Sequence, residues 1–164
     1  MQTPATPATP ATPTRVAMTD LPGLAGTTFG PSSWRTVRQE EVDRFADLTG
    51  DHNPVHTDPT FAAASPFGGT IAHGLLTLSL LVHLCLDFVP KLEGTKLLLN
   101  YGFDKVRFVS PVRVGSRIRA SASLSGASER GPGEVLVKLD VVVEIEGEDK
   151  PALVAEWLSL HVVA

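Results

Sequence analysis

Two side chains that can exchange protons lie five positions apart in the segment Gly50-Asp51-His52-Asn53-Pro54-Val55-His56. Asn53 precedes a proline, which disfavours helical backbone at that residue, and Pro54 fixes its own φ. A carboxylate and an imidazole on either side of such a bend can converge on one small volume, whereas a continuous helix would point them in different directions. A reaction that removes one proton and delivers another needs such a pair within hydrogen-bond reach of its substrate. Asp51 and His56 therefore predict an enzyme.

Size and composition fit one ordinary globular domain. The chain has 164 residues, of which 43% are hydrophobic and 20% charged. Its net charge of −4 offers neither a basic footprint for nucleic acid nor a polybasic patch for a membrane surface. The longest apolar stretch, residues 75–89, is too short to span a bilayer and contains His83 and Asp87. We expect a cytoplasmic protein without nucleic-acid or membrane partners.

The first residues form a low-complexity segment. Residues 1–18 are built on a Thr-Pro-Ala triplet, with prolines at positions 4, 7, 10 and 13. This segment has no apolar core for a signal peptide and no regular hydrogen-bond donors for a strand ladder. The composition predicts a disordered tail over residues 1–20 and a folded domain over residues 21–164.

Hydrophobic periodicity predicts the elements that position the pair. Residues 33–37 fit a short edge strand, and residues 39–48 fit a helix that Gly50 ends. Residues 59–64 fit a second, short helix with proline in its first turn. Residues 71–89 are apolar on nearly every side, which predicts a helix of roughly 25 Å buried in the middle of the domain.

After Pro90 the chain alternates between apolar and polar residues, as strands with one buried face do. We predict strands at 97–109 (bent near Gly102), 117–125, 135–145 and 153–163, with turns at 131–133 and 147–150. One buried helix followed by long antiparallel strands predicts an α+β fold in which the sheet curls round the helix.

Three ordered blocks of the chain resemble the MaoC-like dehydratase family, the (R)-specific enoyl-CoA hydratases with the hot-dog fold. The first runs from Phe45 through Leu48-Thr49-Gly50-Asp51 and Asn53-Pro54-Val55-His56 to Asp58; the second is Pro66-Phe67-Gly68 with Thr70-Ile71-Ala72-His73-Gly74; the third is Asn100-Tyr101-Gly102, Lys105-Val106-Arg107-Phe108, Pro111-Val112 and Val114-Gly115. The resemblance covers about residues 33–163 and is closest to the actinobacterial single-domain members.

This resemblance implies reversible syn addition of water to a trans-2-enoyl-CoA, which gives an (R)-3-hydroxyacyl-CoA. Asp51 and His56 match the family's catalytic pair, and which of them handles which proton stays open. Gly74, at the start of the central helix, would donate its N–H to the thioester oxygen, where enolate charge develops. Asn53 would hold the loop or the water, and His73 would fix the loop or touch the substrate. We expect no cofactor beyond the CoA of the substrate.

The resemblance also implies a homodimer with the substrate tunnel at its interface. Pairing of two edge strands gives a physical reason, because it satisfies backbone groups that a lone edge leaves open. Some family members carry a serine on the central helix that lines the acyl pocket, and this chain has Val82 there. The acyl-chain length, the pathway and the direction of reaction stay open. Candidates for contacts to the CoA phosphates are Arg107, Arg113, Arg117 and Arg119, although a solvated sheet edge is the preferred interpretation for any single one of them.

Two other functions are weighed against hydration. A hot-dog acyl-CoA thioesterase needs a carboxylate on or near the central helix, and Asp87 lies too close to the end of that segment. A non-catalytic acyl-CoA-binding module would need no acid–base pair. We expect no metal site: His52 and His56 could be ligands together with Asp51 and Asp58, but Asn53-Pro54 interrupts the helix that would bring the two histidines to one face, and no further ligand set is present. Cys85, the single cysteine, lies in an apolar run and is expected to be a buried, inert thiol.

Overall fold

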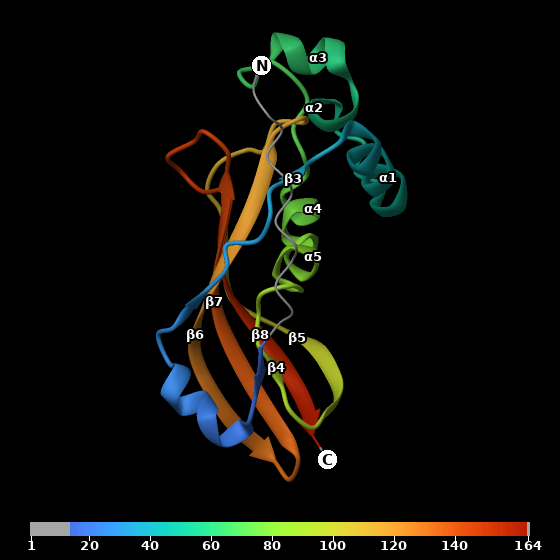
Figure 1. Cartoon of the computed structure of the whole chain (residues 1–164). Coiled ribbons are helices and arrows are strands. Elements are labelled where there is room, and N and C mark those ends of the chain that lie inside the picture. The colour runs from blue at the N-terminus through green and yellow to red at the C-terminus, as the bar shows by residue number, and fades with distance from the viewer. Residues whose placement is uncertain (1–13, 164) are drawn as a thin grey trace, which may run out of the picture.

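The computed structural model describes residues 14–163, and it has the predicted α+β architecture (Figure 1). We expected the tail to reach residue 20, but Arg15–Val16 form strand β1 and Met18–Leu24 form the 3-10 helix η1. The folded part therefore begins earlier than expected, and residues 1–13 of the predicted tail lie outside the described residues. No helix in the described part of the chain is both long enough and apolar enough to cross a membrane.

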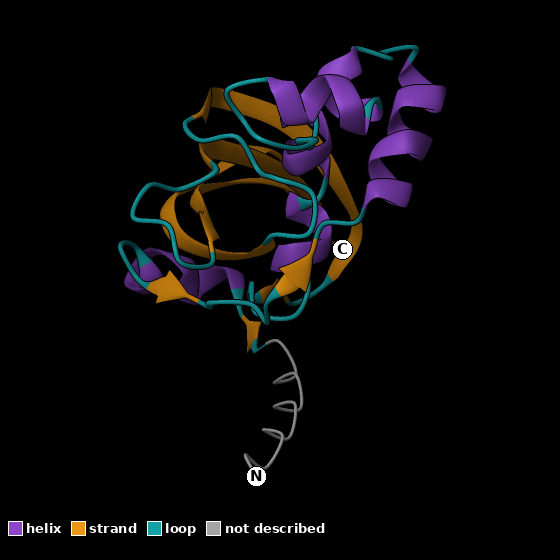
Figure 2. Ribbon diagram, turned by 90° about the horizontal axis from the view of Figure 1, so that it is seen from above, coloured by secondary structure: helices purple, strands orange, loops and turns teal. Residues whose placement is uncertain are grey.

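The main sheet has six strands in the order β2-β6-β7-β8-β5, with β3 also paired to β6. Its strands are β2 (Thr28–Phe29), β3 (Arg35–Thr36), β5 (Thr95–Phe108), β6 (Arg117–Gly131), β7 (Glu134–Ile145) and β8 (Leu153–Val163). All pairings within it are antiparallel, while β1 pairs in parallel with β4 (Lys91–Leu92) in a separate two-stranded sheet. Seen from above, the long strands curve round the central helices (Figure 2). The predicted hot-dog arrangement is confirmed.

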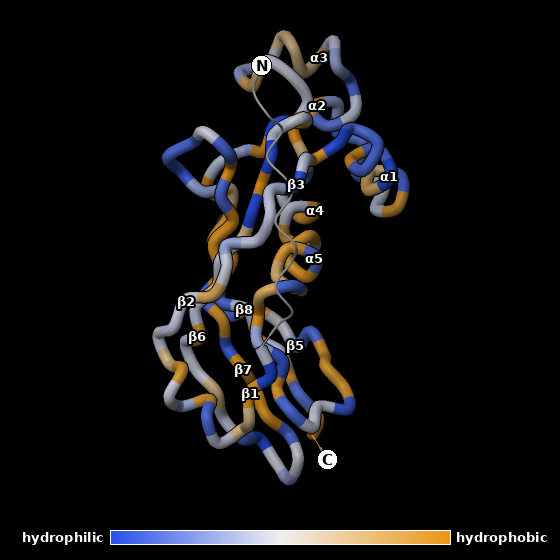
Figure 3. Tube along the Cα trace, viewed as in Figure 1, coloured by the Kyte–Doolittle hydropathy of each residue, from blue (hydrophilic) through white to orange (hydrophobic). Residues whose placement is uncertain are grey.

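The alternating pattern of the strands places one face of the sheet in the core. On β6 and β7 the predicted apolar positions are buried: Ile118, Ala120, Ala122, Leu124, Val135, Val137, Leu139, Val141, Val143 and Ile145. Orange and blue alternate along these strands in Figure 3, which colours the chain by hydropathy. Burial of a Val, Leu or Ile side chain contributes about 1.5–3 kcal/mol, so this face is a main source of stability.

The central helix is shorter than we predicted. Instead of one helix over residues 71–89, it forms α4 (Gly74–Ser79) and α5 (Leu81–Cys85), which meet at Leu80. Its inward side is buried, but Leu75, Val82 and Leu86 on the other side are 60%, 45% and 57% exposed. The described residues 14–163 thus cover this apolar segment on one side only and leave an apolar surface on the other side.

Strand β5 forms one edge of the sheet and carries the same kind of surface. Its large hydrophobic side chains are at least 39% exposed: Leu97, Leu98, Leu99, Tyr101, Phe103 and Phe108. The predicted bend near Gly102 is present as a register shift against β8 between Asn100 and Gly102. A long apolar edge strand with open backbone groups is a template for pairing with another chain.

Candidate active site

The helix that precedes the motif ends where the sequence predicts. Helix α1 (Gln39–Thr49) stops at Gly50, whose φ of 77° is the left-handed conformation that favours glycine, and whose N–H donates to the Ala46 carbonyl at 2.8 Å. The chain then turns, and the N–H of Asn53 donates to Asp51 Oδ1 at 3.4 Å. Asp51 is therefore held in a tight loop at the end of α1.

The motif loop continues into a single helical turn, α2 (Pro54–Thr57), which we did not predict. Asn53 has the predicted non-helical backbone (φ −54°, ψ 127°) and serves as the N-cap, since its side chain accepts from the Val55 N–H. A helix can begin at Pro54 because a first-turn residue needs no N–H partner. This turn gives His56 a fixed direction that an irregular loop would not. Asn53 thus holds the loop, one of its two expected roles.

The ring of His56 is fixed by a backbone carbonyl. Its Nδ1 lies 2.8 Å from the Ile71 oxygen, which can only accept, so Nδ1 carries the hydrogen. The His56 backbone is held as well, because Gln39 Nε2 donates to its carbonyl at 2.7 Å. In the neutral imidazole the remaining nitrogen, Nε2, then has a free lone pair that can take a proton.

A third side chain, His73, contacts both Asp51 and His56. It is 2% exposed, and its Nε2 donates to the main-chain oxygen of Asp51 at 2.9 Å. Its ring stacks on that of His56, with centroids 3.8 Å apart and planes inclined by 28°, and it contacts Phe45 with centroids 5.0 Å apart. Its Nδ1 is buried without a hydrogen-bond partner among the described residues.

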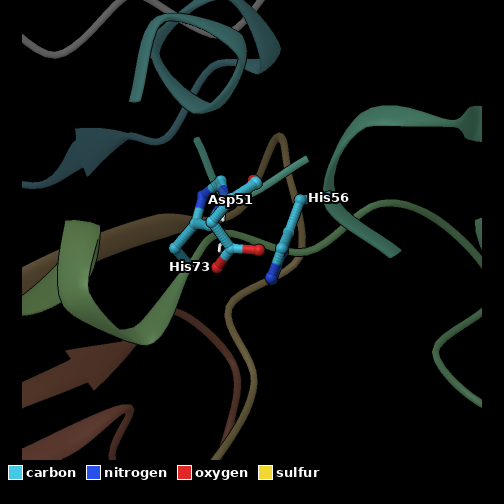
Figure 4. Close-up of side chains that lie close together, drawn as sticks. All are labelled: Asp51, His56 and His73. Carbon is cyan, nitrogen blue, oxygen red and sulfur yellow. Dashed lines mark hydrogen bonds and ion pairs between the residues drawn. The ribbon is translucent and has the colours of Figure 1, made fainter. Parts of the chain in front are cut away.

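The structure brings Asp51 and His56 together and adds His73 to them (Figure 4). One ligand-type atom from each of the three lies within 4.8 Å of the others, and the Asp51 side chain is 56% exposed. Such a cluster has the ligand types of a metal site. The same carboxylate and imidazole groups can also exchange protons with a substrate, which is the chemistry that the sequence predicts.

The other candidate ligands of the motif lie elsewhere. His52 Nε2 is 3.8 Å from Asp47 Oδ1, and the Asp58 side chain caps α3 (Pro59–Ala64) by accepting from two backbone N–H groups. Neither residue belongs to the cluster. Only the packing of the α4 entry against the motif loop brings His73 there, and the motif block Ile71-Ala72-His73-Gly74 was the signal in the sequence.

Gly74 is the first residue of α4, and its N–H makes no backbone hydrogen bond within the described chain. A Cβ at this position would lie 3.1–3.2 Å from three ring atoms of Phe108. A larger residue at this position would therefore need the Phe108 ring to shift by a few tenths of an ångström, whereas glycine allows the close packing of β5 on the start of the helix.

The four arginines considered for CoA phosphates differ in their surroundings. Arg117 pairs with Glu146 at 2.8 Å and Arg119 with Glu144 at 2.6 Å, and both guanidinium groups contact the Trp34 ring. Arg107 and Arg113 form no salt bridge with a described residue. A solvated sheet edge therefore accounts for Arg117 and Arg119, whereas Arg107 and Arg113 stay candidates for contacts to the CoA phosphates.

A cavity of about 480 Å³ lies between α5 and the inner face of β5 and β8. Val82, the position that the resemblance assigns to the acyl pocket, is in its wall, together with Leu86 of the same helical segment. Its floor contains Trp157, Ser159 and His161, which were not predicted to be site residues. They follow the alternation of a strand, so nothing in their spacing distinguishes them from ordinary core positions.

Known proteins resemble this chain over most of its length. The MaoC like domain family matches residues 20–145. The 3-hydroxyacyl-thioester dehydratase Z of Mycobacterium tuberculosis (strain ATCC 25618 / H37Rv) is 50% identical over 146 residues, which are 89% of this chain and 96% of that protein. Nodulation protein N of Rhizobium leguminosarum bv. viciae is 47% identical over 146 residues, 88% of this chain and 91% of that protein.

A solved structure has the same fold. The (R)-hydratase from A. caviae involved in PHA biosynthesis matches with a TM-score of 0.62 and 26% identity, over 82% of this chain and 94% of that one. The predicted enzyme class, a hydro-lyase, is confirmed by the dehydratase and hydratase among these relatives. The chain belongs to the family of MaoC-like dehydratases.

Proposed function

We propose that this MaoC-like hydro-lyase is an (R)-specific enoyl-CoA hydratase, which reversibly converts a trans-2-enoyl-CoA to an (R)-3-hydroxyacyl-CoA. The observation that carries the proposal is the proximity of the exposed Asp51 carboxylate to the His56 imidazole, whose Nδ1 is bonded to the Ile71 carbonyl. Both groups can accept hydrogens of one water molecule and hold it for attack on C3 of the substrate. The proton that the pair removes is returned to C2 on the same face.

Gly74 supports the thioester end in this proposal. As C2 gains electron density, the thioester oxygen becomes an enolate oxygen, and an N–H already directed at it stabilises the transition state. The N–H of Gly74 meets this need because no backbone carbonyl of the described chain accepts from it. The name of one relative, 3-hydroxyacyl-thioester dehydratase Z, also refers to an acyl thioester.

The active form in this proposal is a homodimer. The apolar edge strand β5 and the exposed side of α4 and α5, with Leu75, Val82 and Leu86, form a surface that no other part of the described chain covers. Antiparallel pairing of two β5 strands would satisfy both open edges and cover the apolar side chains at the same time. The two central helices would then line one interface, and residues of both copies would surround the substrate.

The test is hydration of crotonyl-CoA by the purified chain. We expect loss of enoyl absorbance without added metal or nucleotide, with activity retained in EDTA, and chiral analysis of the product should give the (R)-isomer. Release of free thiol without hydration would instead identify a thioesterase, although Asp87, its candidate carboxylate, lines a different cavity beyond α5. Tight binding of acyl-CoA without any turnover would identify a binding module.

A further inference from the structure

The cavity beside α5 lies at a distance from the catalytic end that the strand pairing gives. The pairing of β5 with β8 gives the order of its floor, because Phe108 pairs with Leu153, Phe103 with Trp157, Asn100 with Ser159 and Leu98 with His161. Phe108 packs against Gly74, so the first of these pairs marks the catalytic end. Leu153 and Trp157 are four positions apart on β8, which places the near end of the cavity roughly 13 Å from the proposed position of the thioester.

The floor of this cavity has hydrogen-bond donors in excess. His161 and Ser159 are each 8% exposed, and His161 lies between two hydroxyls, with Thr95 Oγ1 at 3.2 Å from Nδ1 and Ser159 Oγ at 3.2 Å from Nε2. A neutral imidazole has one hydrogen for these two contacts, so one of the hydroxyls keeps its own hydrogen free. Burial lowers the pKa of His161, which keeps the ring neutral. The Nε1–H of Trp157 is buried without an acceptor among the described residues.

Three basic residues also line this cavity. Arg15 of β1, Lys91 of β4 and Lys96 of β5 are exposed to solvent, and none of the three forms a salt bridge with a described residue. The wall formed by the helical segment is apolar, with Val82, Cys85 and Leu86. A ligand that suits both parts has an apolar chain and ends in a group that accepts hydrogen bonds and carries negative charge.

We propose that this cavity receives the far part of the substrate's acyl chain and selects chains that end in a carboxylate over chains that end in a methyl group. The inference rests on the proposed hydratase function and specifies its substrate class, an ω-carboxyacyl thioester of medium length. A methyl-ended chain would leave the Nε1–H of Trp157 without an acceptor, whereas a carboxylate accepts from this N–H and from the hydroxyl beside it.

The experiment compares two substrates of equal length, trans-2-dodecenoyl-CoA and its ω-carboxy analogue, in the hydration assay. We expect the ratio of kcat/KM for the carboxylate to kcat/KM for the methyl substrate to be about ten or more, as one charged hydrogen bond gives. A ratio of one or less overturns the substrate class while leaving the hydratase function intact. No turnover of either substrate, or of crotonyl-CoA, overturns the function itself.

Variants test whether the cavity is the cause. Trp157→Phe keeps an aromatic side chain but removes the Nε1–H, and Lys91→Gln with Lys96→Gln removes two of the charges. Each should lower the ratio several-fold, mainly through KM for the carboxylate substrate, as expected for contacts made equally in the ground and transition states. The matched control is Lys150→Gln, an exposed lysine in the turn before β8. An unchanged ratio in both cavity variants would assign the selectivity to another surface and overturn the proposal.

Discussion

The imidazole of His73 stacks on that of His56, with ring centroids 3.8 Å apart, while its Nε2 donates to the backbone of Asp51. One buried side chain therefore contacts both members of the proposed acid–base pair. Its Nδ1 is buried and has no hydrogen-bond partner among the described residues. We infer that His73 positions the pair. This corresponds to the first of its two expected roles, fixing the loop, and not to the second, contact with the substrate.

Removal of this positioning contact should affect turnover more than binding. We expect His73→Ala to lower kcat on crotonyl-CoA by about 10²-fold with little change in KM, because small displacements of catalytic groups have effects of this size. His73→Gln, which keeps an N–H donor near Asp51, should restore part of the loss. The free energy of unfolding should be measured for both variants. If KM rises while kcat stays constant, His73 contacts the substrate after all.

Asp51→Asn and His56→Gln should each lower kcat by about 10²–10⁴-fold, the usual contribution of a positioned acid or base. The double variant should be little worse than either single one, because two residues that act as a unit are not additive. Steady-state hydration of crotonyl-CoA measures this, and circular dichroism checks the fold. His52→Gln, a change in the same loop outside the cluster, is the control and should stay active. Normal rates in both single variants would contradict the assignment.

The dimer prediction concerns the edge strand β5. Analytical ultracentrifugation of the native chain should give the mass of two copies, and Leu99→Lys should shift it toward one copy, because a charge on a paired apolar edge opposes association. Leu48→Lys is the matched control, since Leu48 is 85% exposed on α1. A native mass of one copy, or an unchanged dimer in Leu99→Lys, would argue against pairing through this part of β5.

The single thiol should be inert in the folded protein. Burial raises the pKa of Cys85 to about 12, and the residue is 2% exposed on α5. At pH 8 almost no thiolate forms, so a thiol reagent should label the native chain far more slowly than the chain in guanidinium. Cys85→Ala, which cannot be labelled, is the blank. Rapid labelling of the native protein would show that α5 opens readily at this cavity.

Acid should destabilise the fold partly through His161, whose pKa is lowered from 6.5 by burial. Below pH 6.5 the unfolded chain binds a proton that the folded chain does not, so the free energy of unfolding falls as the pH falls from 6.5 toward the folded-state pKa. Urea denaturation at pH 7.5 and pH 5.5 should show this fall. The loss should be smaller in His161→Gln than in the native chain, and His52→Gln, an exposed histidine, should keep the native dependence.

Local sequence patterns were enough to predict several of the helices and strands. The end of α1 at Gly50, the helix at residues 59–64 and the buried alternation of β6 and β7 follow from periods of 3.6 and 2 and from the conformational freedom of glycine, all of which act over a few residues. The proximity of Asp51 and His56 was predictable for the same reason, since a bend at Asn53-Pro54 is a local property.

What the tertiary structure decided involves residues far apart in the chain. His73 meets Asp51 only because α4 packs under the motif loop, and the acceptor of His56 is a carbonyl 15 positions away. The central helix is short and open on one side because the surface available to cover it depends on how far the sheet curls, which no window of sequence contains. Likewise, Thr95 and His161 share one cavity only through the pairing of β5 with β8, and strand register is a long-range property.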